Sequence, residues 1–147
     1  MAVTNKNSQQ FILELYKKEH DLLNDNLIFC LMKDTFVFDP ATHSTYAAIS
    51  ADEIATGFGY TQKTKALTNK GVALVAGIVV LTCDNPTWTA AGGAIPDNTA
   101  CCIINDSHVN DTVVCCCEYG AIYSTADGKQ FQINFANGYS KGTPNPV

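Results

Sequence analysis

The sequence predicts a mainly β fold, a single β-sandwich or jelly-roll-like barrel with one N-terminal α-helix. The length of 147 residues, with 46% hydrophobic residues, suits one domain with one core. Apolar residues fall at helical spacing only before residue 24. Beyond that point, short apolar runs recur about every 8–15 residues between clusters of turn residues, which is typical of sandwiches and barrels.

The predicted helix spans residues 8–23 and follows an N-terminal arm, residues 1–7. Its apolar positions begin at Phe11, and Ser8 precedes them as a potential N-cap. Asn24, Asp25 and Asn26 then favour a turn, so the helix should end before them. At the other end of the chain, residues 139–147 hold Gly and Pro and are expected to be a tail.

The sandwich is predicted between residues 27 and 136. Leu27–Met32 is a short apolar run between turn residues, which indicates a buried strand. Ser50 to Glu53 has the S-x-x-E pattern of a capping box and predicts a helical turn at Ile54–Ala55. The later candidate strands are Leu67–Thr68, Gly71–Leu81, Trp88–Thr89, Thr99–Asn105, Thr112–Tyr119 and Gln130–Phe135.

Charge argues against nucleic acid and membrane partners. The formal net charge is −5, and all nine basic residues are Lys, so the chain lacks the basic stripe and the Arg that nucleic-acid binding favours. The longest apolar stretch, residues 72–82, is about half of the ~20 residues that a transmembrane helix needs. No basic-then-apolar signal opens the chain, so we expect a soluble protein made in the cytoplasm.

The seven cysteines are the most unusual feature of the composition. Residues 99–105 and 112–119 flank a polar loop and predict an antiparallel hairpin that holds five of them. Because side chains alternate along a strand, Cys115 and Cys117 should share one face and Cys116 the other, with Cys101 and Cys102 split likewise. We rank inert packing first, a disulfide to a neighbouring subunit through the outward thiols second, and metal ligation last.

The sequence holds no recognisable catalytic constellation, and no cofactor or metal is expected. His20, His43 and His108 lie in polar segments, where we expect them to be solvated, and none belongs to a Cys–His signature. Most Asp residues lie at predicted turns, which explains them without catalysis. A calcium site in the Asn105–Asp111 loop is an open but weak alternative, because its spacing matches no EF-hand.

Six motifs follow one another along residues 11–139: LLNDNLIFCLM (Leu22–Met32), FVFDPATHSTY (Phe36–Tyr46), ISADEIATGFGYT (Ile49–Thr61), KALTNKGV (Lys65–Val72), CDNPTWTA (Cys83–Ala90) and DGKQFQINFANGY (Asp127–Tyr139). Their order resembles a family of small structural proteins of tailed bacteriophages. No single motif is specific, and the resemblance rests on their succession. Two features depart from the family pattern, namely the hydrophobic Phe-Val-Phe before the Asp-Pro turn and the five cysteines of the hairpin.

The resemblance implies a non-enzymatic virion protein, a capsid decoration (cement) protein that binds the outside of the shell. Its partners would then be the major capsid protein and copies of itself, and it would be made in the host cytoplasm. The contact surfaces we expect are the arm Ala2–Asn7, the C-terminal tail and two loops, which are the Phe36–His43 turn and the Gly57–Tyr60 loop. The candidate contact residues in these loops are Phe36, Phe38, His43, Phe58 and Tyr60.

A receptor- or carbohydrate-binding module of a head fibre or tail is the alternative function. Trp88, Tyr60 and Tyr46 would then stack on sugar rings, as aromatic residues in the loops of β-sandwiches do. The competing expectation for Trp88 is a place in the core, which we favour because a lone Trp is usually largely buried.

Overall fold

The computed structural model describes residues 4–134 and 138, and its main element is a five-stranded antiparallel sheet. The order of strands is β1-β8-β7-β2-β3, so the two longest strands, β7 and β8, lie side by side near its middle. The mainly β prediction with one N-terminal helix is confirmed, but the sheets are not closed into a barrel. The strands are β1 (Thr4–Asn7), β2 (Leu27–Lys33), β3 (Lys65–Ala66), β7 (Ile95–Asn105) and β8 (Thr112–Thr125).

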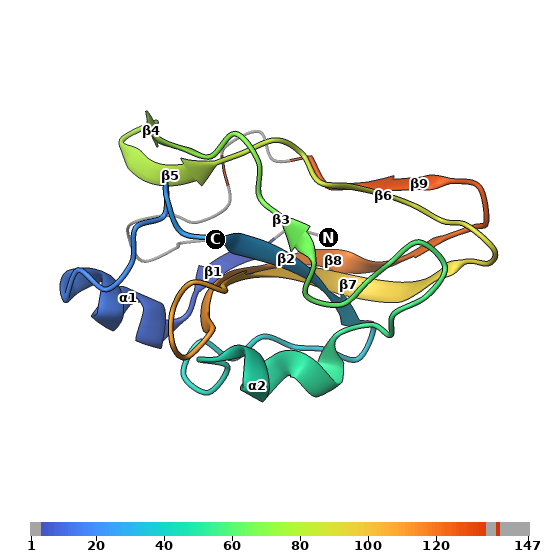
Figure 1. The fold of residues 1–147 in the computed structure, drawn as a ribbon, viewed down its shortest axis with the longest axis horizontal. Helices are drawn as coiled ribbons and strands as arrows, with labels where there is room; N and C mark the ends of the chain where they lie inside the picture. The colour runs from blue at the N-terminus through green and yellow to red at the C-terminus, as the bar shows by residue number, and fades with distance from the viewer. Residues whose placement is uncertain (1–3, 135–137, 139–147) are drawn as a thin grey trace.

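Smaller elements cover both faces of this sheet (Figure 1). Two two-stranded sheets lie over one face: β4 (Gly71–Val75) with β5 (Ile78–Thr82), and β6 (Thr87–Thr89) with β9 (Gln130–Gln132). The short helix α2 (Tyr46–Ile49) and the 3-10 turn η1 (Ser50–Asp52) lie across the other face. The N-terminal helix α1 (Gln9–Tyr16) packs at one end.

The two faces of the sheet belong to two separate hydrophobic clusters. Along β2, Leu27, Phe29 and Leu31 pack toward the two-stranded sheets, together with the buried Trp88. Ile28, Cys30 and Met32 pack in the other cluster, together with Phe36, Phe38 and Ile49. Burial on both sides explains why this strand is a continuous apolar run rather than an alternating one.

The predicted helix is confirmed at its start and wrong at its end. Ser8 is the N-cap, and its Oγ accepts a hydrogen bond from the Phe11 backbone N–H at 3.0 Å. The helix ends at Tyr16 instead of residue 23, because Lys18 takes a left-handed conformation (φ 62°). The Glu19 N–H bonds the Glu14 carbonyl at 3.0 Å, which completes a Schellman-type end without glycine.

Three other local predictions are corrected. Residues 4–7 of the arm are a strand, β1, paired with Glu118 to Cys115 of β8. The run Gly71–Leu81 is not one strand but the β4–β5 hairpin, because Ala76 and Gly77 both have positive φ and make a two-residue turn. The helical turn precedes Glu53 rather than following it, as α2 and η1.

The predicted C-terminal tail, residues 139–147, lies outside the described residues. Within the described part of the chain, no helix has the length and hydrophobicity needed to span a bilayer.

Candidate functional site: an apolar hairpin and a buried Glu–His–His cluster

The five hairpin cysteines lie on both faces of the sheet, as predicted, but none points outward. Cys101 pairs with Cys117 and Cys102 with Cys116 across β7 and β8, and Cys30 of β2 lies opposite Cys102. All of these side chains and Cys115 are buried, because both faces of the sheet are covered. The hypothesis of outward thiols for an intersubunit disulfide is therefore wrong for Cys101, Cys102, Cys115, Cys116 and Cys117.

Burial also suppresses the reactivity of these thiols. It raises the pKa of Cys102 and of Cys117 to about 12, and it raises the pKa of Cys101 and Cys115 well above the usual value. The nucleophilic form of cysteine is the thiolate, so these groups stay protonated and inert near neutral pH. They serve as small core residues, which was the first-ranked expectation.

The residues proposed for contact loops divide into buried and exposed groups. Phe36, Phe38 and Tyr60 are buried, so the expectation that they offer contact surface is wrong. His43 is half-buried and stacks on the Phe36 ring, with 5.2 Å between centroids. Phe58 alone of the five is largely accessible, at 50% exposure.

Trp88 lies in the core, 4% exposed, as we favoured. It and the buried Tyr60 therefore present no ring to a sugar. A different aromatic hollow of about 210 Å³ lies over the end of β8, where the Tyr123 ring is half-exposed. The Tyr119 hydroxyl at this hollow is buried without a hydrogen-bond partner. Its lining is Cys117, Tyr119, Tyr123, Phe131, Gln132, Ile133 and Asn134.

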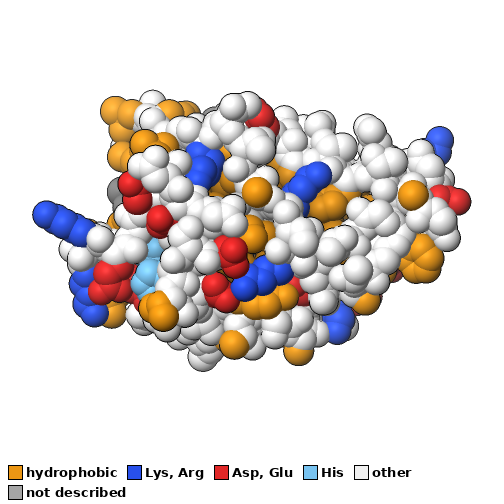
Figure 2. Space-filling view, in the orientation of Figure 1, with side chains coloured by type: hydrophobic (Ala, Val, Ile, Leu, Met, Phe, Trp, Pro, Cys, Tyr) orange, Lys and Arg blue, Asp and Glu red, His pale blue; other side chains and the backbone are white. Residues whose placement is uncertain are grey.

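An exposed apolar surface covers the β4–β5 hairpin. Val72, Leu74 and Val79 are 51%, 72% and 48% exposed, and the strand register places them on one face of the hairpin. No charged residue occurs from Gly71 to Thr82. Figure 2 shows hydrophobic side chains gathered at the corner of the molecule where this hairpin projects. We call Val72, Leu74 and Val79 the hairpin patch.

The hairpin patch continues into a narrow apolar groove beside α1. Phe11, Ile12 and Leu15 of the helix form one wall of this groove, and Val72 and Val79 belong to the other. Exposed contiguous apolar surface of this kind on a monomer usually marks a site of protein contact. The position of α1 therefore shapes the surface that the hairpin offers.

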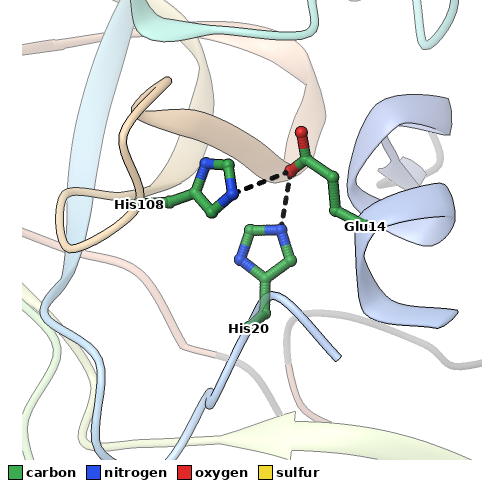
Figure 3. A group of neighbouring side chains, drawn as sticks. All are labelled: Glu14, His20 and His108. Carbon is green, nitrogen blue, oxygen red and sulfur yellow. Dashed lines mark hydrogen bonds and ion pairs between the residues drawn. The ribbon is translucent and has the colours of Figure 1, made fainter. Parts of the chain in front are cut away.

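A buried cluster of Glu14, His20 and His108 lies where α1 meets the main sheet (Figure 3). Glu14 comes from the last turn of α1, His20 from the segment that follows the helix, and His108 from the β7–β8 connection. Their side chains are 2%, 0% and 9% exposed. The expectation that His20 and His108 are solvated is therefore wrong.

Hydrogen bonds converge on the Glu14 carboxylate from several segments. Its Oε2 accepts from the Thr112 hydroxyl at 2.7 Å and lies 2.8 Å from His20 Nε2 and 3.9 Å from His108 Nε2. Its Oε1 accepts from the Gln10 amide at 2.7 Å. Burial by itself raises the pKa of Glu14, but the bonds from Gln10, Thr112 and His20 and the nearby His108 outweigh it and lower the pKa.

The second nitrogen of each imidazole also has a partner. Asn105 Nδ2 lies 2.9 Å from His20 Nδ1 and 2.6 Å from Asp25 Oδ2, so it donates to both. His20 therefore carries its proton on Nε2 and donates it to Glu14. His108 Nδ1 accepts a hydrogen bond from the Asn110 backbone N–H at 3.3 Å and lies 3.0 Å from the Thr112 hydroxyl. The rings of His20 and His108 pack together, with 4.7 Å between centroids.

A second buried carboxylate, Glu53, was also missed by the sequence reasoning. It accepts hydrogen bonds from the hydroxyls of Tyr46 and Tyr60, both at 2.6 Å, and from the Lys63 backbone N–H at 3.0 Å. The Tyr60 hydroxyl accepts in turn from the Leu31 N–H at 2.9 Å. Burial first, and then the Glu53 charge, raises the pKa of both tyrosines, which keeps them as donors.

One sequence signal pointed toward the Glu14 cluster. Glu14 follows Phe11 by three residues and therefore shares its helix face, and these two are the buried residues of α1. A glutamate on an apolar stripe needs buried partners. Which residues supply them depends on the long-range pairing of β7 and β8, which no local pattern encodes.

Comparison of the chain with protein-family models, with curated proteins and with solved structures finds no match.

Proposed function

We propose that the chain is a non-enzymatic structural protein of a tailed phage particle, a decoration protein that binds the outside of the capsid and stabilises it. Its partners are the major capsid protein and copies of itself. The observation that carries this proposal is the hairpin patch, an uncharged apolar surface that projects from a well-covered sheet. The order of sequence motifs shared with tailed-phage structural proteins agrees with this role.

The energetics of the hairpin patch suit a repeated contact. Full burial of a Val or Leu side chain contributes about 1.5–3 kcal/mol, so a half-exposed one adds about 1 kcal/mol when covered. Three such side chains give one copy a weak contact, and many copies on a shell add their contributions. A protein that binds only the assembled shell stabilises that shell by mass action.

The test is co-sedimentation of the purified chain with undecorated capsids of the phage that encodes it. We expect saturable binding, and we expect Leu74→Lys to weaken it at least ~10-fold, because a lysine would have to be desolvated in the contact. Val109→Lys is the matched control. Val109 is an apolar residue that is 92% exposed, and it lies on the β7–β8 connection and not on the β4–β5 hairpin that carries the hairpin patch. Absence of saturable binding, or equal binding by Leu74→Lys, would contradict the proposal.

A carbohydrate-binding module is the second candidate function, now based on the hollow beside Tyr123. Its volume of about 210 Å³ suits a single ring, and its walls hold the rings of Tyr119, Tyr123 and Phe131. The unpartnered Tyr119 hydroxyl is a polar group that a sugar hydroxyl would satisfy. Glycan-array binding that disappears in Tyr123→Ala, with the fold intact by circular dichroism, would favour this function over shell binding.

A further inference from the structure

We propose that Glu14, His20 and His108 bind a zinc ion, a role independent of shell binding. The three side chains come from three separate segments of the chain, and one potential ligand atom of each lies within 4.8 Å of the other two. Two imidazole nitrogens and one carboxylate oxygen are a ligand set that zinc takes in proteins. Burial holds the three groups in place before any ion arrives.

The distances between the ligand atoms are close to those of a tetrahedral site. Zinc–ligand bonds of about 2.0–2.2 Å place neighbouring ligand atoms about 3.4 Å apart. Glu14 Oε2 lies 2.8 Å from His20 Nε2 and 3.9 Å from His108 Nε2. Shifts of about half an ångström, outward at His20 and inward at His108, produce the coordination distances.

His108 changes tautomer when zinc binds. In the metal-free protein its Nδ1 accepts a hydrogen bond from the Asn110 backbone N–H at 3.3 Å, so its Nε2 carries the proton and faces the Glu14 and Glu19 carboxylates. When the ion replaces this proton at Nε2, the ring proton moves to Nδ1, where the Thr112 hydroxyl oxygen at 3.0 Å can accept it because its own proton goes to Glu14. A hydrogen bond from the other ring nitrogen is the usual device that orients a histidine ligand.

His20 must exchange its tautomer when zinc binds. Its Nε2 proton is replaced by the ion, and the ring proton moves to Nδ1, which then needs an acceptor. Asn105 provides one if its side-chain amide makes a half-turn and presents Oδ1 instead of Nδ2 to the ring. This half-turn breaks the bond from Asn105 Nδ2 to Asp25 and the bond that Asn105 Oδ1 accepts from the Ser107 N–H at 3.0 Å, so the Asn105 amide should report zinc binding.

Glu19 lies at the solvent side of the cluster, where its Oε2 is 3.5 Å from His108 Nε2 and its side chain is 40% exposed. It does not belong to the group of ligand atoms that all lie within 4.8 Å of one another, so we expect a water molecule as the fourth ligand. The ion would tie α1 and the segment after it to the β7–β8 connection, and so fix the helix that forms one wall of the groove beside the hairpin patch.

The first test is a calorimetric titration of the reduced, metal-free chain with zinc. We expect the wild-type chain to bind one zinc ion. His20→Gln and His108→Gln should each lower the zinc affinity by about 100-fold or more, since loss of even an outer partner weakens metal sites about 10–100-fold. His43→Gln is the matched control, a histidine outside the cluster, and should bind as the wild type does.

Spectroscopy of the wild-type chain separates this site from the cysteines and avoids variants that fail to fold. Cobalt(II) bound at the cluster gives a tetrahedral spectrum without thiolate-to-metal charge transfer, whereas cysteine ligation adds that absorption. Nitrogen-15 NMR should show the ring signals of His20 and His108 and the Asn105 amide shifting with zinc. Cys83 is the one cysteine that is only half-buried, so it is the cysteine to test as a competing ligand. The proposal would be overturned by absence of zinc binding, by a thiolate band, or by binding that Cys83→Ser abolishes and that His20→Gln and His108→Gln leave unchanged.

Discussion

Glu14 and Glu53 are both buried carboxylates, yet the donors around them differ in kind. Glu53 is held by two tyrosine hydroxyls and one backbone N–H. Glu14 is held by a threonine hydroxyl, a half-buried glutamine and an imidazole, with a second imidazole close by. The number of partners is similar, but only the histidines offer ring nitrogens that can ligate a metal.

This difference assigns the two carboxylates different roles. The donors of Glu53 stay protonated, since the pKa values of Tyr46 and Tyr60 are raised, and the network joins η1 and the Lys63 segment to β2 through the Leu31 N–H. The Glu53 network therefore has a single hydrogen-bonded state, and its role is to stabilise the fold. The Glu14 network has two states, hydrogen-bonded or metal-bound, and therefore can respond to what surrounds the protein.

Among the substitutions considered, removal of either carboxylate should lower the free energy of unfolding the most. The size of the loss should show which of the two networks contributes more to stability. Glu53→Ala leaves two hydroxyls and one N–H without their acceptor, so we expect the free energy of unfolding to fall by about 3 kcal/mol. Glu14→Ala should lower it by about 2 kcal/mol in metal-free buffer, because Gln10 can turn to water and the Thr112 hydroxyl keeps His108. Urea denaturation measures both values.

The control for this pair is Asp52→Ala, which removes the half-exposed carboxylate next to Glu53. It should change the free energy of unfolding by about 0.5 kcal/mol or less. A loss at Glu14 equal to or greater than that at Glu53 would contradict the comparison.

Removal of single hydroxyls from the Glu53 network should have intermediate effects. Tyr60→Phe deletes the group that links the Glu53 carboxylate to the Leu31 N–H in the core, and should lower the free energy of unfolding by about 1.5 kcal/mol. Tyr46→Phe should lower it by about 0.5 kcal/mol, because the Tyr46 side chain is only half-buried and water can reach its place. Equal effects in thermal unfolding would mean that Glu53 is more solvated than its burial indicates.

The sequence predicted the features that depend on the local periodicity of side chains along a helix or strand. The alternation of side chains placed Cys101 and Cys102, and likewise Cys116 and Cys117, on opposite faces, and the structure confirms this division. The N-cap at Ser8 and the buried strand that begins at Leu27 followed equally local rules. These features depend on residues within a few positions of one another, which is why a pattern could identify them.

The sequence did not predict what depends on contacts between distant segments. The second face of the sheet is covered by α2 and the Phe36–Phe38 segment, whose surroundings are polar and suggested an exposed loop. With that face covered, no cysteine of the hairpin points outward. His20 and His108 looked solvated for the same reason, because their burial arises only when α1 packs against the β7–β8 connection.

His108→Gln should have the smallest effect on the metal-free protein and the clearest effect with zinc. In the metal-free protein, His108 Nε2 is 3.9 Å from Glu14 and makes no hydrogen bond to it. The substitution removes the contact to Thr112, a long bond of 3.3 Å from the Asn110 N–H and the partly exposed pair with Glu19, all of them weak. We expect a loss of about 0.5 kcal/mol in the free energy of unfolding. At a free zinc concentration 100 times the dissociation constant, the wild type gains about 2.7 kcal/mol and the variant almost none of it. Paired urea titrations with zinc and with chelator measure both quantities. If His108→Gln already lowers the free energy of unfolding by about 2 kcal/mol or more in chelator, the prediction is contradicted. His108 would then stabilise the fold, as the tyrosine donors of Glu53 do, and would not be a group free to bind a metal.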